Sequence, residues 1–422
     1  MSIITDIISR IELPQMAPAS QKFDSQHVDD PRAELRYRLR EKGINRTLRP
    51  GMKVAITAGS RGIRNIPILL QTLVSEVKAA GAVPFLVPAM GSHGGATAKG
   101  QKEMLKGLGI TEESMGCPIC SSMEVVKIGK TADGKDVFLD SNAAHADGII
   151  VMNRVKAHTS FTGQYESGLL KMMSVGLGKQ VGAQACHREG HGKMAEYVKE
   201  YGTAVLKNAN ILFGVAILEN AYDETRRLEV LFPGEFLDRE PELLAEAKAH
   251  MPKIHLTDLD VLIVDRMGKD ISGLGMDPHV TGSFVSEYAR GPKRPGSIAV
   301  LDMTEAAHGN GTGIGVADVT TERLYRKIDF EATYANVMTA CMPAAARVPL
   351  VMKNQKQAVQ AAIQVSRCAD RKKIRVVRIS DTLHLEKIWV SEALLEEVDG
   401  HPQMTVLGEK SPLAFNGSGD LF

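Results

Sequence analysis

The chain has 422 residues, which is enough for two ordinary domains with separate cores, and its 44% hydrophobic and 24% charged residues are typical of a soluble globular enzyme. The formal net charge of +1 gives no sign of a nucleic-acid or anionic-membrane partner. The five cysteines are too scattered for a disulfide framework, and no apolar run reaches the roughly 18–20 residues of a membrane span. The N-terminus also lacks a signal-peptide pattern. We therefore expect a cytoplasmic protein.

Predicted strands and helices alternate in the first half of the chain. The first fifty residues are polar and irregular, apart from a charged stretch at 29–42 that is typical of a surface helix. After them, strands are expected at 52–57, 83–89, 148–152, 210–218 and 228–232, and helices at 66–80, 97–108 and 233–250. This alternation implies crossover connections and a mostly parallel sheet that helices cover on both faces.

A second α/β series begins after the stretch 252–258, which is the expected domain boundary. Strands are expected at 259–264, 297–301 and 373–379, with a helix at 355–365. We therefore expect an α/β fold of two domains with mostly parallel sheets. The first domain, at 1–255, is expected to bind the cofactor and carry the catalytic residues. The second is an α/β domain at 256–422, and its last segment could pack against the first domain. Ligands in such folds bind at the carboxyl ends of strands, so the active site is expected in the cleft between the domains.

Polar loops follow the first two predicted strands. Arg61 and Arg64 lie in a Gly-flanked turn, and either guanidinium is able to clamp a substrate carboxylate bidentately. Two surface arginines without such a role explain this turn equally well. His93 lies between glycines that let the backbone approach a ligand closely. An imidazole suits acid/base chemistry near neutral pH, although a surface histidine without a function fits the same pattern.

The most informative stretch follows the strand at 148–152. His158 comes first, either as an acid/base group or as a residue that ends the strand. Lys171 then lies in a predicted helix with leucines and methionines on both sides. A lone helical lysine is usually solvated, but apolar neighbours desolvate an amine, lower its pKa and make it nucleophilic.

His187 lies sixteen residues after Lys171. His187 and His191 are four residues apart, which on a helix places both on one face. Arg188, however, stands where the HExxH motif of zinc hydrolases has its glutamate. A single metal ligand at His187 therefore fits better than a His187/His191 pair.

Three further patterns point less clearly to chemistry. Lys269 lies in a loop that mirrors the loops of the first domain, and its placement predicts a contact to the substrate across the cleft. The Gly-rich stretch 309–315 matches neither phosphate-binding fingerprint, because Ile314 replaces the third glycine of GxGxxG. Cys117 and Cys120 form a lone CxxC, which we interpret as reduced structural thiols.

In these residues the sequence resembles the nickel-pincer nucleotide-dependent lactate racemase family, the 2-hydroxyacid racemases and epimerases. The resemblance covers most of the chain and is strongest over 61–191. The family's pattern has a carboxylate-binding Arg after the first strand, a Gly-x-His, a His before a Gly-rich run that ends in Lys, and a His sixteen residues later. In this sequence these positions are Arg61, His93, His158, Lys171 and His187, and the Lys-to-His interval is the most specific match.

The resemblance implies a racemase or epimerase of a small 2-hydroxy acid that works by proton-coupled hydride transfer. The implied cofactor is nickel in a nickel-pincer pyridinium mononucleotide, covalently tethered to Lys171, with His187 as the metal ligand. His93 and His158 are the implied acid/base pair, and Arg61 is the implied carboxylate clamp. Enzymes that mature the cofactor are implied as partners.

Some positions depart from the family's pattern. The stretch between His158 and Lys171 is a few residues longer, which makes Lys179 the second choice for the tether. Arg64 is the second choice for the clamp, and Lys269 is the nearest match by position to the family's C-terminal lysine. Because these differences fall around the substrate, a longer or more polar 2-hydroxy acid fits as well as lactate.

Two other classes of function stay open beside this main hypothesis. One is a non-catalytic α/β protein that binds a small carboxylate. Such a protein does not require a modified lysine, so Lys171→Ala would leave its affinity for the carboxylate largely intact. A metal-dependent hydrolase built on His187 and His191 needs zinc and a carboxylate ligand that the neighbouring sequence does not supply.

Overall fold

The chain folds into two compact units in a computed structural model, which describes residues 3–60, 62–188 and 190–422 and leaves out the side chains of His187 and His191. The first unit is Asp24–Met251, and the second unit joins Met1–Phe23 to Pro252–Phe422. The change of unit at Met251 lies next to the boundary that the sequence predicts.

The first unit is built on a five-stranded sheet with the order β3-β2-β6-β7-β8. Its strands are β2 (Lys53–Ala58), β3 (Val83–Pro88), β6 (Gly148–Arg154), β7 (Ile211–Glu219) and β8 (Thr225–Leu231). The first four run parallel, and β8 pairs with β7 in the antiparallel sense. A separate hairpin joins β4 (Val125–Lys130) to β5 (Asp136–Asp140).

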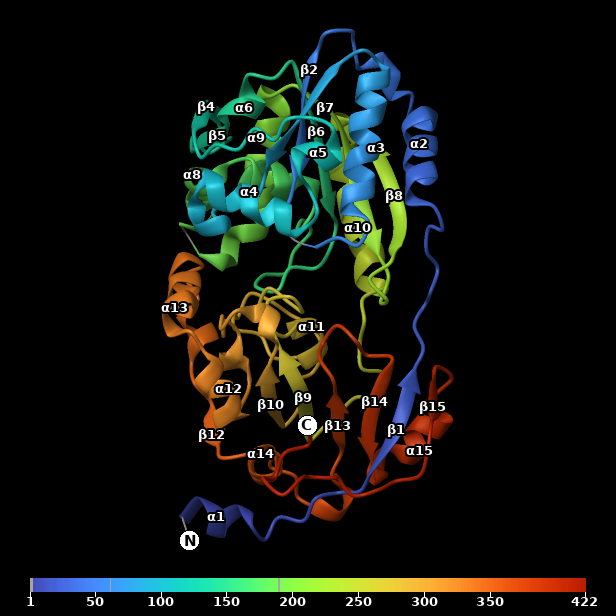
Figure 1. The fold of residues 1–422 in the computed structure, drawn as a ribbon, viewed down its shortest axis with the longest axis vertical. Helices are drawn as coiled ribbons and strands as arrows, with labels where there is room; N and C mark the ends of the chain where they lie inside the picture. The colour runs from blue at the N-terminus through green and yellow to red at the C-terminus, as the bar shows by residue number, and fades with distance from the viewer. Residues whose placement is uncertain (1–2, 61, 189) are drawn as a thin grey trace. The chain divides into compact units, whose positions relative to one another are not determined.

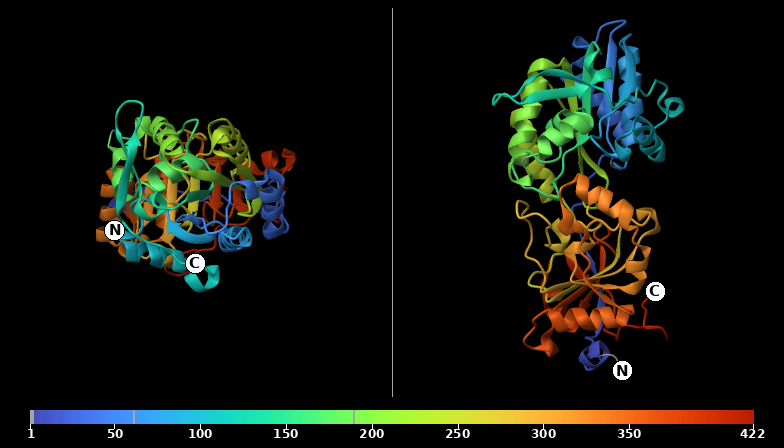
Figure 2. Two further views of the ribbon diagram at one scale, coloured as in Figure 1. Left: turned by 90° about the horizontal axis from the view of Figure 1, so that it is seen from above. Right: turned by 90° about the vertical axis from the view of Figure 1, so that its left-hand side faces the viewer.

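Helices cover both faces of this sheet (Figures 1 and 2). They are α2 (Pro31–Lys42), α3 (Ile66–Ala79), α4 (Ala98–Gly107), α5 (Glu112–Met115), α6 (Ser141–Ala144), α7 (Leu169–Lys171), α8 (Lys179–His187), α9 (Met194–Asn208) and α10 (Phe236–Ala249). Successive residues of β2 enter opposite cores: Val54 and Ile56 pack with α2 and α3, and Ala55 packs with α9 and α10. Burial on both faces explains why the parallel strands are nearly continuous apolar runs.

The second unit is built on an eight-stranded sheet with the order β12-β11-β10-β9-β13-β14-β1-β15. Its strands are β1 (Met16–Gln21), β9 (Val261–Met267), β10 (Ser297–Met303), β11 (Val319–Thr321), β12 (Leu350–Met352), β13 (Val376–Ile379), β14 (Lys387–Ser391) and β15 (Met404–Val406). Its helices are α1 (Ile3–Ile8), α11 (Pro278–Thr281), α12 (Glu322–Lys327), α13 (Phe330–Thr339), α14 (Gln355–Val365) and α15 (Leu395–Gly400). Strands β9 to β13 pair in parallel, whereas β14, β1 and β15 pair in the antiparallel sense. The expected α/β class with mostly parallel sheets is confirmed.

The N-terminal segment belongs to the second unit. The sequence predicts residues 1–255 as one domain, but β1 pairs with β14 on one side and with β15 on the other, as the blue strand between two red strands in Figure 1 shows. Ala19 in β1 is fully buried in the same core as β9 and β10. This strand is short and is followed by the polar stretch 22–30, so the sequence pattern does not indicate it.

None of the helices in the described ranges combines the length and the apolar composition that crossing a membrane requires.

Candidate functional site

Loops gather at the carboxyl ends of the parallel strands of the first unit. Ser60 follows β2, His93 follows β3 and His158 follows β6. Because β2 pairs in parallel with both β3 and β6, these three loops leave the sheet at the same edge. The helical run that carries Lys171 contacts the loop after β3: the Gly176 carbonyl accepts a hydrogen bond from the Gly91 N–H at 3.1 Å.

The His93 loop is held from both sides. The His93 Nδ1 lies 2.5 Å from the Ser60 hydroxyl, so the loop after β2 orients the imidazole ring. The buried Gln101 side chain donates to the carbonyls of Gly91 at 2.9 Å and of His93 at 3.3 Å. The His93 side chain itself is exposed, as an acid/base group that meets a substrate must be.

A buried carboxylate shapes the His158 loop. Lys156 and Ser167 exchange two backbone hydrogen bonds that close the loop. Inside it, the Glu166 carboxylate is 1% exposed and accepts from the backbone N–H of His158 at 2.6 Å and of Gly163 at 3.0 Å. The ammonium of Lys248 lies 2.6 Å from the same carboxylate and offsets its charge. This anchor fixes the backbone from which the His158 ring projects.

The ring of Phe161 lies next to both His158 and Lys171. It stacks on the His158 imidazole with a centroid distance of 4.2 Å, and the Lys171 Nζ lies 5.8 Å from its centroid. The His158 Nδ1 accepts a hydrogen bond from the Ser160 backbone N–H at 3.1 Å. His158 and Lys171 are both half-buried. Thus one amine and one imidazole share a partly desolvated surface.

Lys171 and His187 lie in a helical run that turns back on itself. Sixteen residues of straight helix would separate them by about 24 Å. The run is interrupted after the π-helical segment Met172–Gly176, where Lys179 takes a left-handed φ of 53°. Burial raises the pKa of the Cys186 thiol to about 12, and the nearby Lys171 ammonium acts in the opposite direction. The helical run therefore changes its course between Lys171 and His187.

Lys179 has a structural role at this turn. Its side chain is fully buried, and its Nζ donates to the Pro88 carbonyl at 2.5 Å and to the Gln101 side chain at 3.0 Å. It also pairs with the buried Asp140 carboxylate at 3.1 Å. Burial lowers the pKa of Lys179 and raises the pKa of Asp140. The ion pair between them shifts each pKa in the opposite direction, but by less.

A second buried carboxylate anchors the start of the Lys171 helix. Glu240 in α10 accepts hydrogen bonds from the backbone N–H groups of Leu169 at 2.8 Å and of Leu170 at 3.0 Å. Burial raises its pKa to about 7, although both hydrogen bonds oppose this change. A side chain on Gly168 would clash with this carboxylate, because a Cβ there would lie 2.4 Å from Glu240 Oε1. The fixed start of α7 sets the position of Lys171, the third residue of this helix.

The remaining predicted residues are placed as follows. Arg61 lies outside the described residues, and so do the side chains of His187 and His191, although the backbone of α8 ends at His187. Arg64 is exposed, and its backbone N–H donates to Glu219 at 3.0 Å. Lys269 lies in the second unit, where its Nζ donates to the Gly273 carbonyl at 2.7 Å.

The side chains that the structure describes include no group of three or more His, Cys, Asp or Glu residues placed to hold a metal ion. Ser60, Glu166 and Glu240 are not among the site residues that the sequence predicts. No local motif marks these three, because each acts on a residue that is distant in sequence or on a backbone amide.

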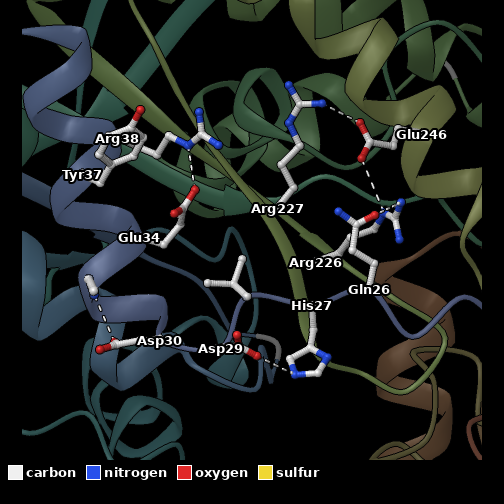
Figure 3. Close-up of a pocket in the computed structure, with 12 residues that line it drawn as sticks. Gln26, His27, Asp29, Asp30, Glu34, Tyr37, Arg38, Arg226, Arg227 and Glu246 are labelled. Atoms are coloured by element: carbon white, nitrogen blue, oxygen red, sulfur yellow. Dashed lines mark hydrogen bonds and ion pairs between the residues drawn. The ribbon is translucent and has the colours of Figure 1, made fainter.

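A cavity of about 660 Å³ lies elsewhere in the first unit, beside α2, β8 and α10 (Figure 3). Its lining residues are Gln26, His27, Val28, Asp29, Asp30, Ala33, Glu34, Tyr37, Arg38, Arg226, Arg227 and Glu246. Its charged groups largely neutralise one another: Arg38 pairs with Glu34, and Arg226 and Arg227 both pair with Glu246. None of the predicted site residues lines this cavity.

Comparisons with known proteins show which family and which fold the chain is similar to. Residues 11–209 match the family model described as the lactate racemase N-terminal domain, which confirms the resemblance over this range. The chain is similar to the structure of the lactate racemase apoprotein from Thermoanaerobacterium thermosaccharolyticum, with a TM-score of 0.50 and 13% identity over 85% of this chain and 93% of that chain. This likeness shows a shared fold.

A protein from Thermotoga maritima is also similar, with a TM-score of 0.46 and 14% identity over 62% of this chain and 69% of that chain. A comparison of the sequence with curated proteins gives no match.

Proposed function

We propose that this chain, whose residues 11–209 match the family model of the lactate racemase N-terminal domain, is a racemase or epimerase of a small 2-hydroxy acid. The observation that carries the proposal is the grouping of His93, His158 and Lys171 around one sheet edge, with Phe161 stacked on one imidazole and next to the amine. Two acid/base groups and a partly desolvated amine are what a reversible reaction on a tethered cofactor requires.

The residues fit a nickel-pincer pyridinium mononucleotide that is bound covalently through Lys171. Lys171 is half-buried next to an aromatic ring, whereas the amine of Lys179 is fully buried and takes part in three polar contacts. A thioamide needs an amine that a nucleotide is able to reach, so Lys171 is the better tether. The sixteen-residue interval from Lys171 to His187, which matches the family's pattern, and the suitability of imidazole as a nickel ligand support His187 as the metal ligand.

A cofactor held by Lys171 and His187 would supply a reversible acceptor for the hydride of the substrate carbon. The side chains of this chain have other tasks in the proposal. His93 and His158 exchange the proton of the 2-hydroxyl group, and Arg61 or Arg64 binds the carboxylate so that the intermediate 2-oxo acid stays in place. Lys269 stays a predicted substrate contact. Enzymes that make and load the cofactor are the expected partners.

The experiment that tests this function starts from protein purified from a host that makes the cofactor. Intact-mass measurement with peptide mapping is expected to show added mass on Lys171 and about one nickel per chain. Chiral chromatography then follows the conversion of single enantiomers of a panel of 2-hydroxy acids. Unmodified, nickel-free protein from such a host would favour a non-catalytic carboxylate-binding protein instead.

Two variants separate the roles of the site residues. Lys171→Ala is expected to lose both the added mass and the nickel, because the covalent tether is gone. His93→Ala is expected to keep both and to lose racemisation, because only the proton acceptor is missing. A Lys171→Ala protein that still carried a nickel-containing chromophore would rule out this tether.

A further inference from the structure

One buried side chain holds the loop that carries His93. Gln101 in α4 is fully buried, and its amide lies within hydrogen-bond distance of the Lys179 ammonium and of the carbonyls of Gly91 and His93. We propose that Gln101 is a positioning residue for His93, that Lys179 holds it in its working orientation, and that this pair ties the loop to the helical run that carries Lys171. This inference rests on the proposed function and names the groups that set the place of one of its two acid/base histidines.

The donors of the Lys179 ammonium are matched one to one by acceptors. An ammonium group has three N–H bonds and no lone pair. The Lys179 Nζ lies 2.5 Å from the Pro88 carbonyl and 3.0 Å from the Gln101 Oε1. The third acceptor is the Asp140 carboxylate at 3.1 Å. Three acceptors around one amine favour its charged form and give each of the three contacts a fixed direction.

The same count of donors and acceptors fixes which way the Gln101 amide points. Its oxygen faces the Lys179 ammonium, because an amide NH2 group has no lone pair to offer a cation. Its NH2 group therefore faces the loop, where the carbonyls of Gly91 and His93 accept at 2.9 and 3.3 Å. In the reversed orientation two donors would face each other, and the amide oxygen would face two carbonyl oxygens. Only one orientation satisfies the buried groups at both ends.

The two carbonyls that the amide holds belong to a loop segment with little remaining freedom. Gly91 takes a left-handed φ of 59°, and its N–H donates to the Gly176 carbonyl at 3.1 Å. The His93 N–H donates to the Met90 carbonyl at 3.1 Å. Because the N–H and the C=O of His93 both have partners, the direction in which its side chain leaves the backbone is set. The Ser60 hydroxyl then orients the ring from the next loop.

Two links join this loop to the helical run that carries Lys171. One is the backbone hydrogen bond of Gly91, and the other is the contact between Gln101 and Lys179, the first residue of α8. A change at Gln101 breaks the second link and frees the two loop carbonyls, whereas α7 keeps its own buried anchor. We therefore expect such a change to displace His93 and to leave Lys171 in place.

Gln101→Glu removes the two donors and keeps the rest of the side chain. The glutamate has the same length and still presents an oxygen to Lys179, but an ionised carboxylate has no hydrogen to donate to the loop carbonyls. Gln101→Met fills a similar space without a charge and makes no hydrogen bond to the loop. It gives the same test if the buried charge of the glutamate variant prevents folding.

Hydrogen exchange of the full chain without cofactor measures the loop directly. In both variants, peptides that cover 90–97 are expected to exchange about tenfold faster than in the wild type, the effect of one or two lost hydrogen bonds. Peptides from β7, in the sheet of the same unit, are expected to keep the wild-type rate. Unchanged exchange of the loop, or equal acceleration in the loop and in β7, would overturn the positioning role.

Kinetics of the loaded enzyme give the second readout. Gln101→Glu and Gln101→Met are expected to lower kcat for racemisation about tenfold, with KM and nickel content close to those of the wild type. A displaced His93 slows proton transfer, whereas carboxylate binding and the tether at Lys171 do not depend on this loop. A variant with a fast-exchanging loop and the wild-type kcat would overturn the inference.

The part of Lys179 is tested by removing both buried charges together. Lys179→Met/Asp140→Asn takes the cation away from the Gln101 oxygen without leaving a charged carboxylate behind, and it is expected to speed exchange of the loop about threefold or more. A loop that exchanged as slowly as in the wild type would show that Gln101 holds it without Lys179. Glu103→Gln is the control on the same helix, because this side chain is 65% exposed, and it is expected to change neither exchange nor kcat.

The outcomes separate this inference from the proposed function. An active wild type together with Gln101 variants at the wild-type kcat would overturn the inference and leave the racemase intact. A loaded wild type that converts no 2-hydroxy acid would remove the proposed function, while hydrogen exchange would still decide whether Gln101 and Lys179 hold the loop.

Discussion

The Ser60 hydroxyl lies within hydrogen-bond distance of the His93 Nδ1 and so orients the imidazole ring at the candidate site. We expect Ser60→Ala to lower kcat about tenfold with little change in cofactor content, since the loss of one hydrogen bond leaves the imidazole less well oriented. The measurement is the initial rate of racemisation next to the nickel content of the same preparation.

Ser92 offers a matched control for Ser60. It lies beside His93, and its hydroxyl makes no hydrogen bond to any residue within the described ranges. Ser92→Ala is therefore expected to keep the wild-type rate. Equal losses in both variants would mean that the Ser60 contact does not matter for the reaction.

The site residues differ in whether the sequence alone can identify them. His93, His158 and Lys171 are predictable, because their types, their glycine neighbours and their spacing follow from local sequence. Glu166 and Glu240 are not predictable in this way, because a buried acid that accepts backbone hydrogen bonds looks like any surface glutamate until the fold removes it from water. Side-chain burial, which three-dimensional packing decides, is the missing information.

Among the elements, the reversal between the π-helical segment and α8 depends on a buried ion pair. Lys179→Met would leave the Asp140 carboxylate buried without its cation, so we expect the free energy of unfolding to fall by about 3–5 kcal/mol. Urea unfolding followed by circular dichroism measures this change. The double variant Lys179→Met/Asp140→Asn is expected to recover part of the loss.

Lys99→Met in α4 is the control for this prediction. Its side chain is 88% exposed and its ion pair with Glu103 is long, at 3.8 Å, so its removal is expected to change the free energy of unfolding by less than about 0.5 kcal/mol. A Lys179→Met protein as stable as Lys99→Met would show that the buried pair adds little.

The anchor of α7 predicts a pH dependence. Burial raises the pKa of Glu240 from its ordinary value of 4.5 to about 7. Between these values the folded protein keeps a proton that the unfolded chain releases, so this group lowers stability as the pH rises and makes no further change above about pH 7. In Glu240→Gln this dependence is absent.

The test compares the variant with the wild type at about pH 4.5 and about pH 8. The variant is expected to gain on the order of 3 kcal/mol relative to the wild type over this range. Glu242→Gln on the same helix is the control, because this side chain is 61% exposed and is expected to show no such change. A difference between wild type and Glu240→Gln that stayed constant with pH would contradict a raised pKa.

At the scale of the whole chain, the two units differ in how they are assembled. Both cores of the first unit are formed by residues within 24–251, so this fragment is expected to unfold cooperatively by itself. The fragment 252–422 lacks β1, the strand between β14 and β15, and is expected not to reach a stable fold. Circular dichroism and size-exclusion chromatography distinguish these outcomes.

A linked version of the second unit completes this test. Phe23 stacks on His255 with a centroid distance of 5.2 Å, so the two segments of the second unit come together near the point of fusion. Replacement of residues 24–251 by a short Gly/Ser linker is therefore expected to restore the fold. A folded 252–422 fragment without β1 would show that this strand is dispensable.

The architecture follows from sequence where the signal is periodic and local. The longer parallel strands and α14 lie within a few residues of their expected positions, because buried parallel strands are apolar runs and amphipathic helices repeat every 3.6 residues. The three-residue strands β11 and β12 were not expected, because so short a run carries no periodic signal. The pairing of β1 is not predictable in this way, because its partners β14 and β15 lie more than 360 residues later in the chain.

The position of β1 has a consequence for synthesis on the ribosome. This strand emerges first, yet both of its neighbours emerge near the end, after the first unit has left the exit tunnel. Throughout that interval β1 offers unpaired backbone groups and apolar side chains to any other nascent chain. We therefore expect the yield of mature chains to depend on translation speed and chaperone supply, and a chain cut short before β14 to keep its first strand unpaired.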